Sequence, residues 1–275
     1  MLLQRVITAL VLLPIVLGAV WFAPTPWLYL LFSGAGLLAA WEWTAMMGLS
    51  QTAAARGRRW GYVLLSAAVL GGAWLVRQAW PWLAAVSVLW WLCALFLMPG
   101  FPGSLQRHRP GVPALGLLGQ ILWVPAILCL VILGGMQEHG LRLIYLFALV
   151  WAADVGAYLA GRNFGRNKLA PNVSPGKTRE GALGGLLLCG IYAVTAGGYV
   201  FQPASPRQLL LLVGLSLLVA ALSIVGDLGI SMFKRLSGIK DSGNLLPGHG
   251  GILDRIDCLL SAAPAMALGL YWLRL

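Results

Sequence analysis

Three carboxylates lie close together in the segment KDSGNLLPGHGGILDRID (residues 240–257) of a chain that has only eight acidic residues. They are Asp241, Asp254 and Asp257, and they are interspersed with basic residues and glycines. Asp254 and Asp257 are three residues apart, so a helix would place both on one face. Carboxylates that converge from two segments are typical ligands of a hard octahedral cation such as Mg²⁺. The segment therefore predicts a metal site beside groups that bind an anion.

A second set of charged residues precedes this segment in GDLGISMFKR, where Asp227, Ser231 and Lys234 are spaced by four and three residues. This spacing defines one stripe of a helix. Asp227 and Asp254 are the strongest candidates for metal ligands, and the other two acids of residues 240–257 come next. An amphipathic loop bound to anionic lipid would explain the basic residues, but not the carboxylates beside them. The candidate groups for phosphate oxygens are Lys234, Arg235, Lys240, Arg255 and, in the turn PGHGG, His249.

The motif SPGKT ends like a phosphate-binding loop, with Ser174, Gly176, Lys177 and Thr178 as its candidate ligands. A P-loop of the Walker type is excluded, because that pattern requires glycine where Pro171 stands and we expect no strand before it. What remains is a glycine that lets backbone come close, a lysine and two hydroxyl groups, which suit a phosphate at a helix N-terminus. The alternative is a solvated basic loop without a ligand.

Asp154 lies inside an apolar segment, in WAADVGAY, and Tyr158 follows four residues later on the same helical face. A carboxylate within a membrane span is a functional candidate by default. A structural ion pair with Arg162 is the alternative. Glu42, in WEWT, is expected to be an interfacial anchor, because it lies near a helix end between two tryptophans.

The composition excludes a soluble globular protein. Of the 275 residues, 60% are hydrophobic and only 10% are charged, whereas a soluble domain carries about 25% charged residues. Positively charged cytoplasmic loops and anionic lipid head groups explain the net charge of +11, so no nucleic acid is expected as a partner. The four cysteines form no CxxC pair and are expected to be small core residues rather than metal ligands or disulfides.

Nine apolar segments predict an all-α polytopic integral membrane protein with about nine transmembrane helices. Lipid offers no hydrogen-bond partners, so the backbone polar groups of each segment must pair with one another within a helix. The first segment resembles a signal peptide but has no convincing cleavage site, so we expect a retained helix. The segments are roughly residues 6–22, 27–47, 61–76, 81–98, 115–136, 141–160, 182–201, 208–226 and 258–273.

The loops between these segments set the expected topology. With nine spans, fifteen of the 19 Lys and Arg residues fall on the side of the N-terminus, which is therefore predicted to be cytoplasmic. We expect residues 1–140 to form a scaffold that also carries dimer contacts, and residues 141–275 to form the catalytic region. Its functional loops, 161–181 and 227–257, would face the cytoplasm at a bacterial-type inner membrane. Nine of the fifteen basic residues lie in these two loops, so the topology depends partly on the function assigned to them.

The segment SMFKRLSGIKDSGNLLPGHGGILDRID, residues 231–257, resembles the signature of the phosphatidate cytidylyltransferases, also called CDP-diacylglycerol synthases. Every fixed position of that signature is present: Ser-x-apolar-Lys-Arg, then Lys-Asp, the His-Gly-Gly turn and Asp-Arg-apolar-Asp. SPGKTREG and DVGAYLAGRNFG are also similar to that family, so the resemblance covers about residues 151–257. It implies a homodimeric membrane enzyme that converts CTP and phosphatidic acid to CDP-diacylglycerol and pyrophosphate with Mg²⁺, a second cation being left open.

Under this resemblance the phosphatidate phosphate attacks the α-phosphorus of CTP directly, and no strong general base is needed. Lys177, with Ser174 and Thr178, is expected to hold the CTP phosphates, and the remaining basic residues are divided between the nucleotide and the lipid phosphate. Two alternatives remain open. A CTP-dependent lipid kinase would release CDP. A non-enzymatic lipid- or nucleotide-binding membrane protein, such as a transporter or scaffold, would bind CTP without turnover.

Overall fold

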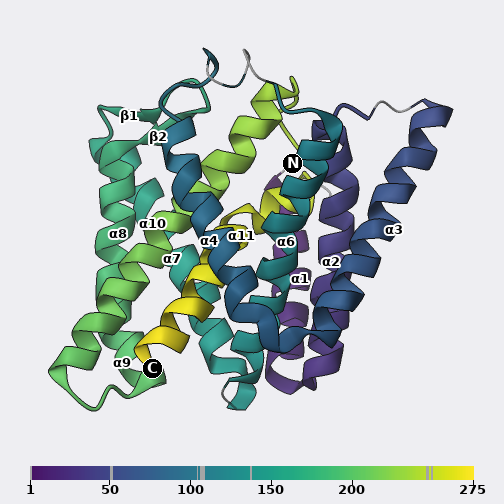
Figure 1. The fold of residues 1–275 in the computed structure, drawn as a ribbon. Helices are drawn as coiled ribbons and strands as arrows, with labels where there is room; N and C mark the ends of the chain where they lie inside the picture. The colour runs from purple at the N-terminus through teal and green to yellow at the C-terminus, as the bar shows by residue number, and fades with distance from the viewer. Residues whose placement is uncertain are drawn as a thin grey trace.

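The computed structural model describes residues 2–49, 52–103, 105, 109–136, 138–245, 248 and 250–275. These residues form a bundle of helices with a small hairpin at one end (Figure 1). The helices are α1 (Leu2–Phe22), α2 (Thr25–Met46), α3 (Ala53–Leu75), η1 (Arg77–Ala79), α4 (Trp80–Leu97), α6 (Val112–Gly135), η2 (Glu138–Gly140), α7 (Leu141–Phe164), α8 (Arg179–Tyr192), η3 (Ala193–Gly197), α9 (Gly198–Phe201), α10 (Pro206–Leu236) and α11 (Leu253–Leu273).

The structure confirms a polytopic, almost wholly helical membrane protein. Each apolar segment of the sequence lies in a helix, and the count of nine spans stays a prediction. Within the described residues, six helical stretches are long and apolar enough to cross a membrane: Arg77–Leu97, Val112–Gly135, Leu141–Phe164, Arg179–Phe201, Pro206–Leu236 and Leu253–Leu273.

The hairpin corrects one expectation, because SPGKT is itself a strand and a strand does precede it. β1 (Lys168–Ala170) pairs antiparallel with β2 (Ser174–Thr178), and Lys168 lies opposite Thr178. β2 leads directly into α8, where the Thr178 hydroxyl accepts a hydrogen bond from the Gly181 N–H at 3.1 Å. Thr178 is thus the N-cap of α8, and the motif ends at a helix N-terminus as the sequence predicts.

The loop expected at residues 227–257 is shorter in the structure. α10 continues to Leu236 and α11 begins at Leu253, which leaves 237–252 between them. The extra turns of α10 form inside the core, where Leu228, Ile230 and Phe233 are buried on different sides of the helix and stabilise it past Asp227.

The N-terminal helices pack directly on those that carry the charged motifs. In Figure 1, α4, α6 and α11 lie between α1–α3 on one side and α7, α8 and α10 on the other. The fully buried Trp43 of α2 meets Phe233 of α10 edge-on, with ring centroids 5.4 Å apart. Trp91 of α4 donates a hydrogen bond to the Leu260 carbonyl of α11 at 3.1 Å. Helices early in the chain therefore help to set the positions of α10 and α11.

Candidate active site

Lys177 and Asp227 join the hairpin to α10. The Lys177 Nζ donates to Asp227 Oδ2 at 2.6 Å, and the Ser231 hydroxyl donates to Asp227 Oδ1 at 3.3 Å. The two charged side chains keep 30% and 26% of their surface exposed, so a ligand can still reach them. Burial lowers the pKa of Lys177, but the Asp227 carboxylate more than offsets this, so the pKa lies above its ordinary value. Lys177 is therefore a cation at neutral pH.

Lys234 and Asp254 form a second and more deeply buried ion pair, between α10 and the first turn of α11. The Lys234 Nζ donates to Asp254 Oδ1 at 2.7 Å, and only 10% and 7% of the two side chains is exposed. The other carboxylate oxygen of Asp254 accepts from the Ser242 N–H at 2.9 Å and the Gly251 N–H at 3.0 Å. Asp254 thus holds the loop 237–252 against both helices.

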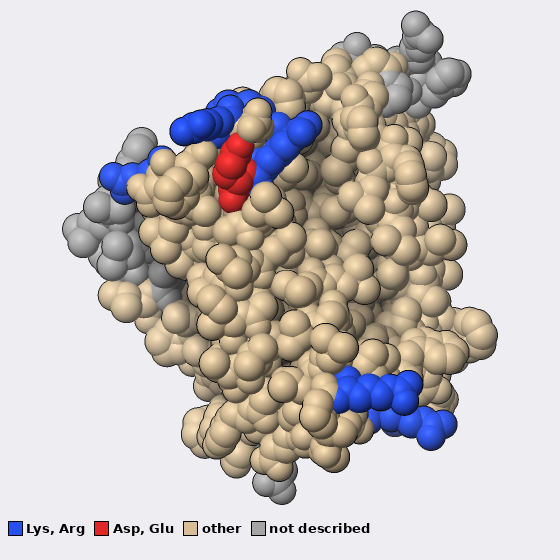
Figure 2. Space-filling model, turned by 90° about the vertical axis from the view of Figure 1, so that its left-hand side faces the viewer, with Lys and Arg blue, Asp and Glu red and all other residues tan. Residues whose placement is uncertain are grey.

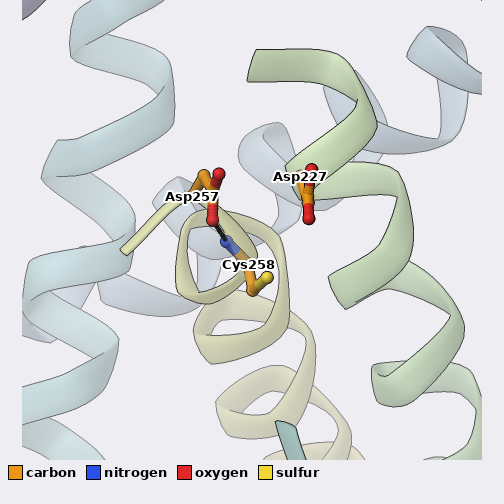
Figure 3. Close-up of side chains that lie close together, drawn as sticks. All are labelled: Asp227, Asp257 and Cys258. Carbon is orange, nitrogen blue, oxygen red and sulfur yellow. Dashed lines mark hydrogen bonds between the residues drawn. The ribbon is translucent and has the colours of Figure 1, made fainter. Parts of the chain in front are cut away.

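Asp227, Asp257 and Cys258 form the closest group of possible metal ligands within the described residues. Their ligand atoms lie within 4.8 Å of one another. Figure 3 shows Asp257 and Cys258 on α11, next to the turn of α10 that carries Asp227. Asp257 is only 7% exposed, and one of its oxygens accepts from the Cys258 N–H at 2.8 Å. Asp254, which the sequence ranks above Asp257 as a ligand, lies outside this group; its role in metal binding stays a prediction.

Gly226 allows the two helices to approach closely at this point. A Cβ at residue 226 would lie 2.7 Å from the Asp257 carbonyl and in contact with the Ser261 hydroxyl. Any larger residue would therefore push α10 away from α11. The carboxylate of the next residue, Asp227, approaches Asp257 because glycine stands at this crossing.

A cavity of about 360 Å³ opens beside the Lys177–Asp227 pair, between α7, the hairpin and the start of α8. Sites for small ligands commonly have volumes of about 300–1,000 Å³. Asp154 and Tyr158 line it from one face of α7, as the sequence predicts, together with Arg162, whose guanidinium donates to the Tyr158 hydroxyl at 3.3 Å. From the hairpin and α8 it is lined by Gly176, Lys177 and Thr178.

Basic side chains surround the hairpin end of the molecule. Figure 2 shows Lys and Arg gathered there around acidic side chains, and a second basic group at the opposite end of the same face. The acidic Glu180 is fixed in this region because it accepts hydrogen bonds from the backbone N–H groups of Arg166 and Asn167. The exposed basic residues of the hairpin and the helix ends beside it are Arg162, Arg166, Lys168 and Arg179.

The remaining candidate residues lie at the edge of this region. Arg235 is exposed and ties the end of α10 to the hairpin turn, through its Nε and the Val173 carbonyl at 3.3 Å. Ser174 is half-buried at the start of β2. His249 lies outside the described residues. The other predicted groups, Lys240 and Asp241 in the loop and Arg255 on α11, are exposed.

Two residues have roles that the sequence interpretation missed. Glu42 is not an interfacial anchor: it is 5% exposed and accepts hydrogen bonds from Ser242, Ile252 and Leu253. Cys258 is not a plain core residue, because it lies beside two carboxylates. Its position directly after Asp257 was an available signal. Nothing near Glu42 in the sequence indicates partners 200 residues away. Cys93 is exposed and so is not the core residue that was expected, whereas Cys129 and Cys189 are buried as predicted.

Comparison with known proteins decides the family. The model of the Cytidylyltransferase family matches residues 3–273. This chain belongs to the cytidylyltransferase family. The match includes the N-terminal helices, in which the sequence shows no recognisable motif.

Two relatives named phosphatidate cytidylyltransferase are similar over nearly the whole chain, and a third over about half of it. The phosphatidate cytidylyltransferase of Pseudomonas aeruginosa is 41% identical over 272 residues, which is 99% of this chain and 97% of the relative. That of Haemophilus influenzae is 39% identical over 285 residues, 96% of each protein. The phosphatidate cytidylyltransferase of Staphylococcus aureus is 42% identical over 131 residues, covering 47% of this chain and 49% of the relative.

Proposed function

We propose that this protein is a phosphatidate cytidylyltransferase, which converts CTP and phosphatidic acid to CDP-diacylglycerol and pyrophosphate. The observation that carries the proposal is that Asp227 and Asp257, on two different helices, converge beside Lys177 and a cavity. Cations and carboxylates at one place suit a metal nucleotide, because the metal binds carboxylates and the phosphates bind cations. The relatives that match nearly all of the chain carry this activity in their names.

The residues at the cluster fit a Mg²⁺ ion. Asp227 and Asp257 offer hard carboxylate oxygens within reach of one ion, and phosphate oxygens or water would complete its shell. Cys258 is a soft donor that suits Mg²⁺ poorly, so the two carboxylates are the proposed ligands. A bound Mg²⁺ would neutralise charge on the phosphates and orient them. Asp254 would not bind the metal but would support the site, because it holds Lys234 and the loop 237–252 in place.

The proposed chemistry is attack by a phosphate oxygen of phosphatidic acid on the α-phosphorus of CTP. A P–O bond forms to the lipid phosphate while the bond to pyrophosphate breaks. The attacking phosphate is already ionised near neutral pH, so catalysis consists of positioning and charge neutralisation. Lys177 would bind phosphate while it keeps its contact with Asp227, and the hairpin glycine Gly176 would let backbone approach the nucleotide.

The proposed membrane topology has nine spans, with the N-terminus and the hairpin in the cytoplasm of a bacterial inner membrane. Its support is the charge distribution together with the arrangement in Figure 1, where α1 begins in the half of the bundle that carries the hairpin and α11 ends in the opposite half. The cavity would then receive CTP from the cytoplasm and phosphatidic acid from the bilayer. The proposed functional unit is a homodimer among membrane lipids.

The test uses purified protein in mixed micelles with phosphatidic acid, Mg²⁺ and CTP labelled in the cytosine. Label should enter the lipid fraction with an equal amount of pyrophosphate, and a chelator should stop the reaction until Mg²⁺ is restored. Asp257→Asn should lose activity by about a hundredfold or more. Release of CDP with a phosphorylated lipid would replace the proposal by a lipid kinase. Binding of CTP without turnover by folded protein would replace it by a non-enzymatic function.

A further inference from the structure

Glu42 of α2 contacts the far end of the chain through three hydrogen bonds. The Ser242 hydroxyl donates to Glu42 Oε2 at 2.7 Å, the Leu253 N–H donates to the same oxygen at 2.8 Å, and the Ile252 N–H donates to Oε1 at 2.9 Å. Ile252 is the N-cap of α11 and Leu253 its first residue. The carboxylate therefore binds backbone N–H groups at the N-terminus of α11, which have no partner within the helix.

Because Glu42 is buried, its carboxylate needs these hydrogen-bond donors. Glu42 is 5% exposed, and a buried carboxylate is tolerated only where donors replace the water that it loses. Hydrogen bonds to an ionised acceptor are roughly twice as strong as neutral ones. The positive end of the helix dipole adds to this stabilisation. Glutamine, which has the same shape, would turn an NH₂ group towards N–H donors and leave at least one of them unsatisfied.

The loop 237–252 is attached to α2 at both of its ends. At its start, the Ser237 hydroxyl donates to the Met46 carbonyl at 2.9 Å, one turn of α2 beyond Glu42. At its end, Glu42 holds Ile252. The loop closes onto the carboxylate because the two loop residues that face it, Gly243 and Gly251, have no side chain. A Cβ at Gly243 would lie 2.6 Å from Glu42 Oε1, and a Cβ at Gly251 would collide with Oε2.

Ser242 connects Glu42 to the site itself. Its hydroxyl donates to Glu42, and its N–H donates to Asp254 Oδ2 at 2.9 Å. Asp254 in turn accepts from Lys234, and Asp257 follows one helical turn later on α11. A chain of contacts thus leads from an N-terminal helix, through one residue of the loop, to the first turn of α11.

We propose that Glu42 is a positioning residue of the active site. Its carboxylate fixes the N-terminus of α11 and the loop before it, and so sets the places of Asp254 and Asp257 relative to Asp227. The proposal rests on the proposed function for the catalytic effect, but not for the contact itself. It assigns the N-terminal helices a part in catalysis beyond that of a scaffold, because Glu42 would act through the N-terminus of α11 and not by binding substrate.

The test compares Glu42→Gln with Thr44→Val in the full-length protein. Thr44 is buried two residues later on α2, where its hydroxyl donates to Trp41 and accepts from Arg59, away from the loop. Glu42→Gln should lower kcat by about 10- to 100-fold, the usual range for a partner that orients a site's ligands. KM for CTP should stay within about threefold, because Lys177 lies on the hairpin. Thr44→Val should keep the wild-type kcat.

Hydrogen exchange supplies a readout that does not depend on activity. The N–H groups of Ile252 and Leu253 should exchange at least about tenfold faster in Glu42→Gln, while α6 keeps its wild-type rates. Wild-type kcat and exchange in Glu42→Gln would overturn the proposal. Equal loss of folded protein and activity in both variants would also overturn it, by showing a purely structural role. A wild-type protein that transfers no cytidylyl group would overturn the proposed function, and with it the catalytic part of this inference.

Discussion

Lys177 Nζ and Asp227 Oδ2 lie 2.6 Å apart, although 50 residues separate them in the chain. The lysine comes from a two-stranded hairpin and the aspartate from the last third of the membrane helix α10. The pair therefore marks the point at which the hairpin motif and the motif of α10 and α11 become one site. Neither side chain is fully buried, so a ligand in the adjacent cavity can reach the pair while the two side chains stay in contact.

Lys177→Met should remove most of the activity. The variant keeps an apolar stem of similar length but loses the cation that we place at the CTP phosphates, so kcat/KM should fall by about a hundredfold or more. The assay is transfer of label from CTP to lipid. Lys168→Met, at the exposed first residue of β1, is the matched control and should keep activity within about threefold. Equal losses in the two variants would point to a general effect of basic charge at the hairpin.

Substitutions of the two aspartates of DRID, Asp254 and Asp257, should differ in their effect on stability but not in their effect on activity. Asp254→Asn removes the charge that pairs with the buried Lys234, and breaking such a pair costs about 3–5 kcal/mol. Asp257→Asn instead relieves repulsion from the nearby Asp227 carboxylate. We therefore expect thermal unfolding in detergent to shift downwards for Asp254→Asn only, whereas both variants lose transfer activity. A larger loss of stability in Asp257→Asn would contradict this assignment.

The charge of the Lys177–Asp227 pair predicts a pH dependence of stability. Because the pKa of Lys177 is raised in the folded protein, its contribution is fully present below the unfolded pKa of about 10.4 and is lost as the pH rises through the folded pKa. The difference in unfolding temperature between wild type and Lys177→Met should thus stay constant from about pH 7 to 9.5 and shrink only above about 10.5. A difference that disappears near pH 8 would mean that the lysine is not held as a cation.

The helices and most of the chemical groups were predictable from the sequence, because both depend on local patterns. Long apolar runs give helices, and the spacing of Asp254 and Asp257 gives one helical face. The N-terminal part of the site was not predictable. Glu42 has tryptophan on both sides, and only the fold brings it to a helix N-terminus more than 200 residues away. The hairpin was missed because SPGKT contains proline and glycine, which disfavour strands. Only the fold shows that this segment pairs with β1.

The close crossing of α10 and α11 gives the sharpest test of how the carboxylates are brought together. In Gly226→Ala the new Cβ would meet the Asp257 carbonyl and the Ser261 hydroxyl, so the helices must separate. Overpacking of this kind costs about 1–3 kcal/mol and should displace Asp227 from Asp257. We expect a lower unfolding temperature, and a fall in activity that higher Mg²⁺ concentrations partly restore.

The control for this crossing is Gly214→Ala on the same helix, where an added Cβ has no neighbour within 4 Å. Alanine favours a helix over glycine by about 1 kcal/mol, so this variant should be as stable as wild type or more stable, with unchanged activity. The contrast between two identical substitutions on one helix isolates the contact from the change in helix propensity. If Gly226→Ala behaved like Gly214→Ala, the distance between Asp227 and Asp257 would not depend on glycine at this crossing.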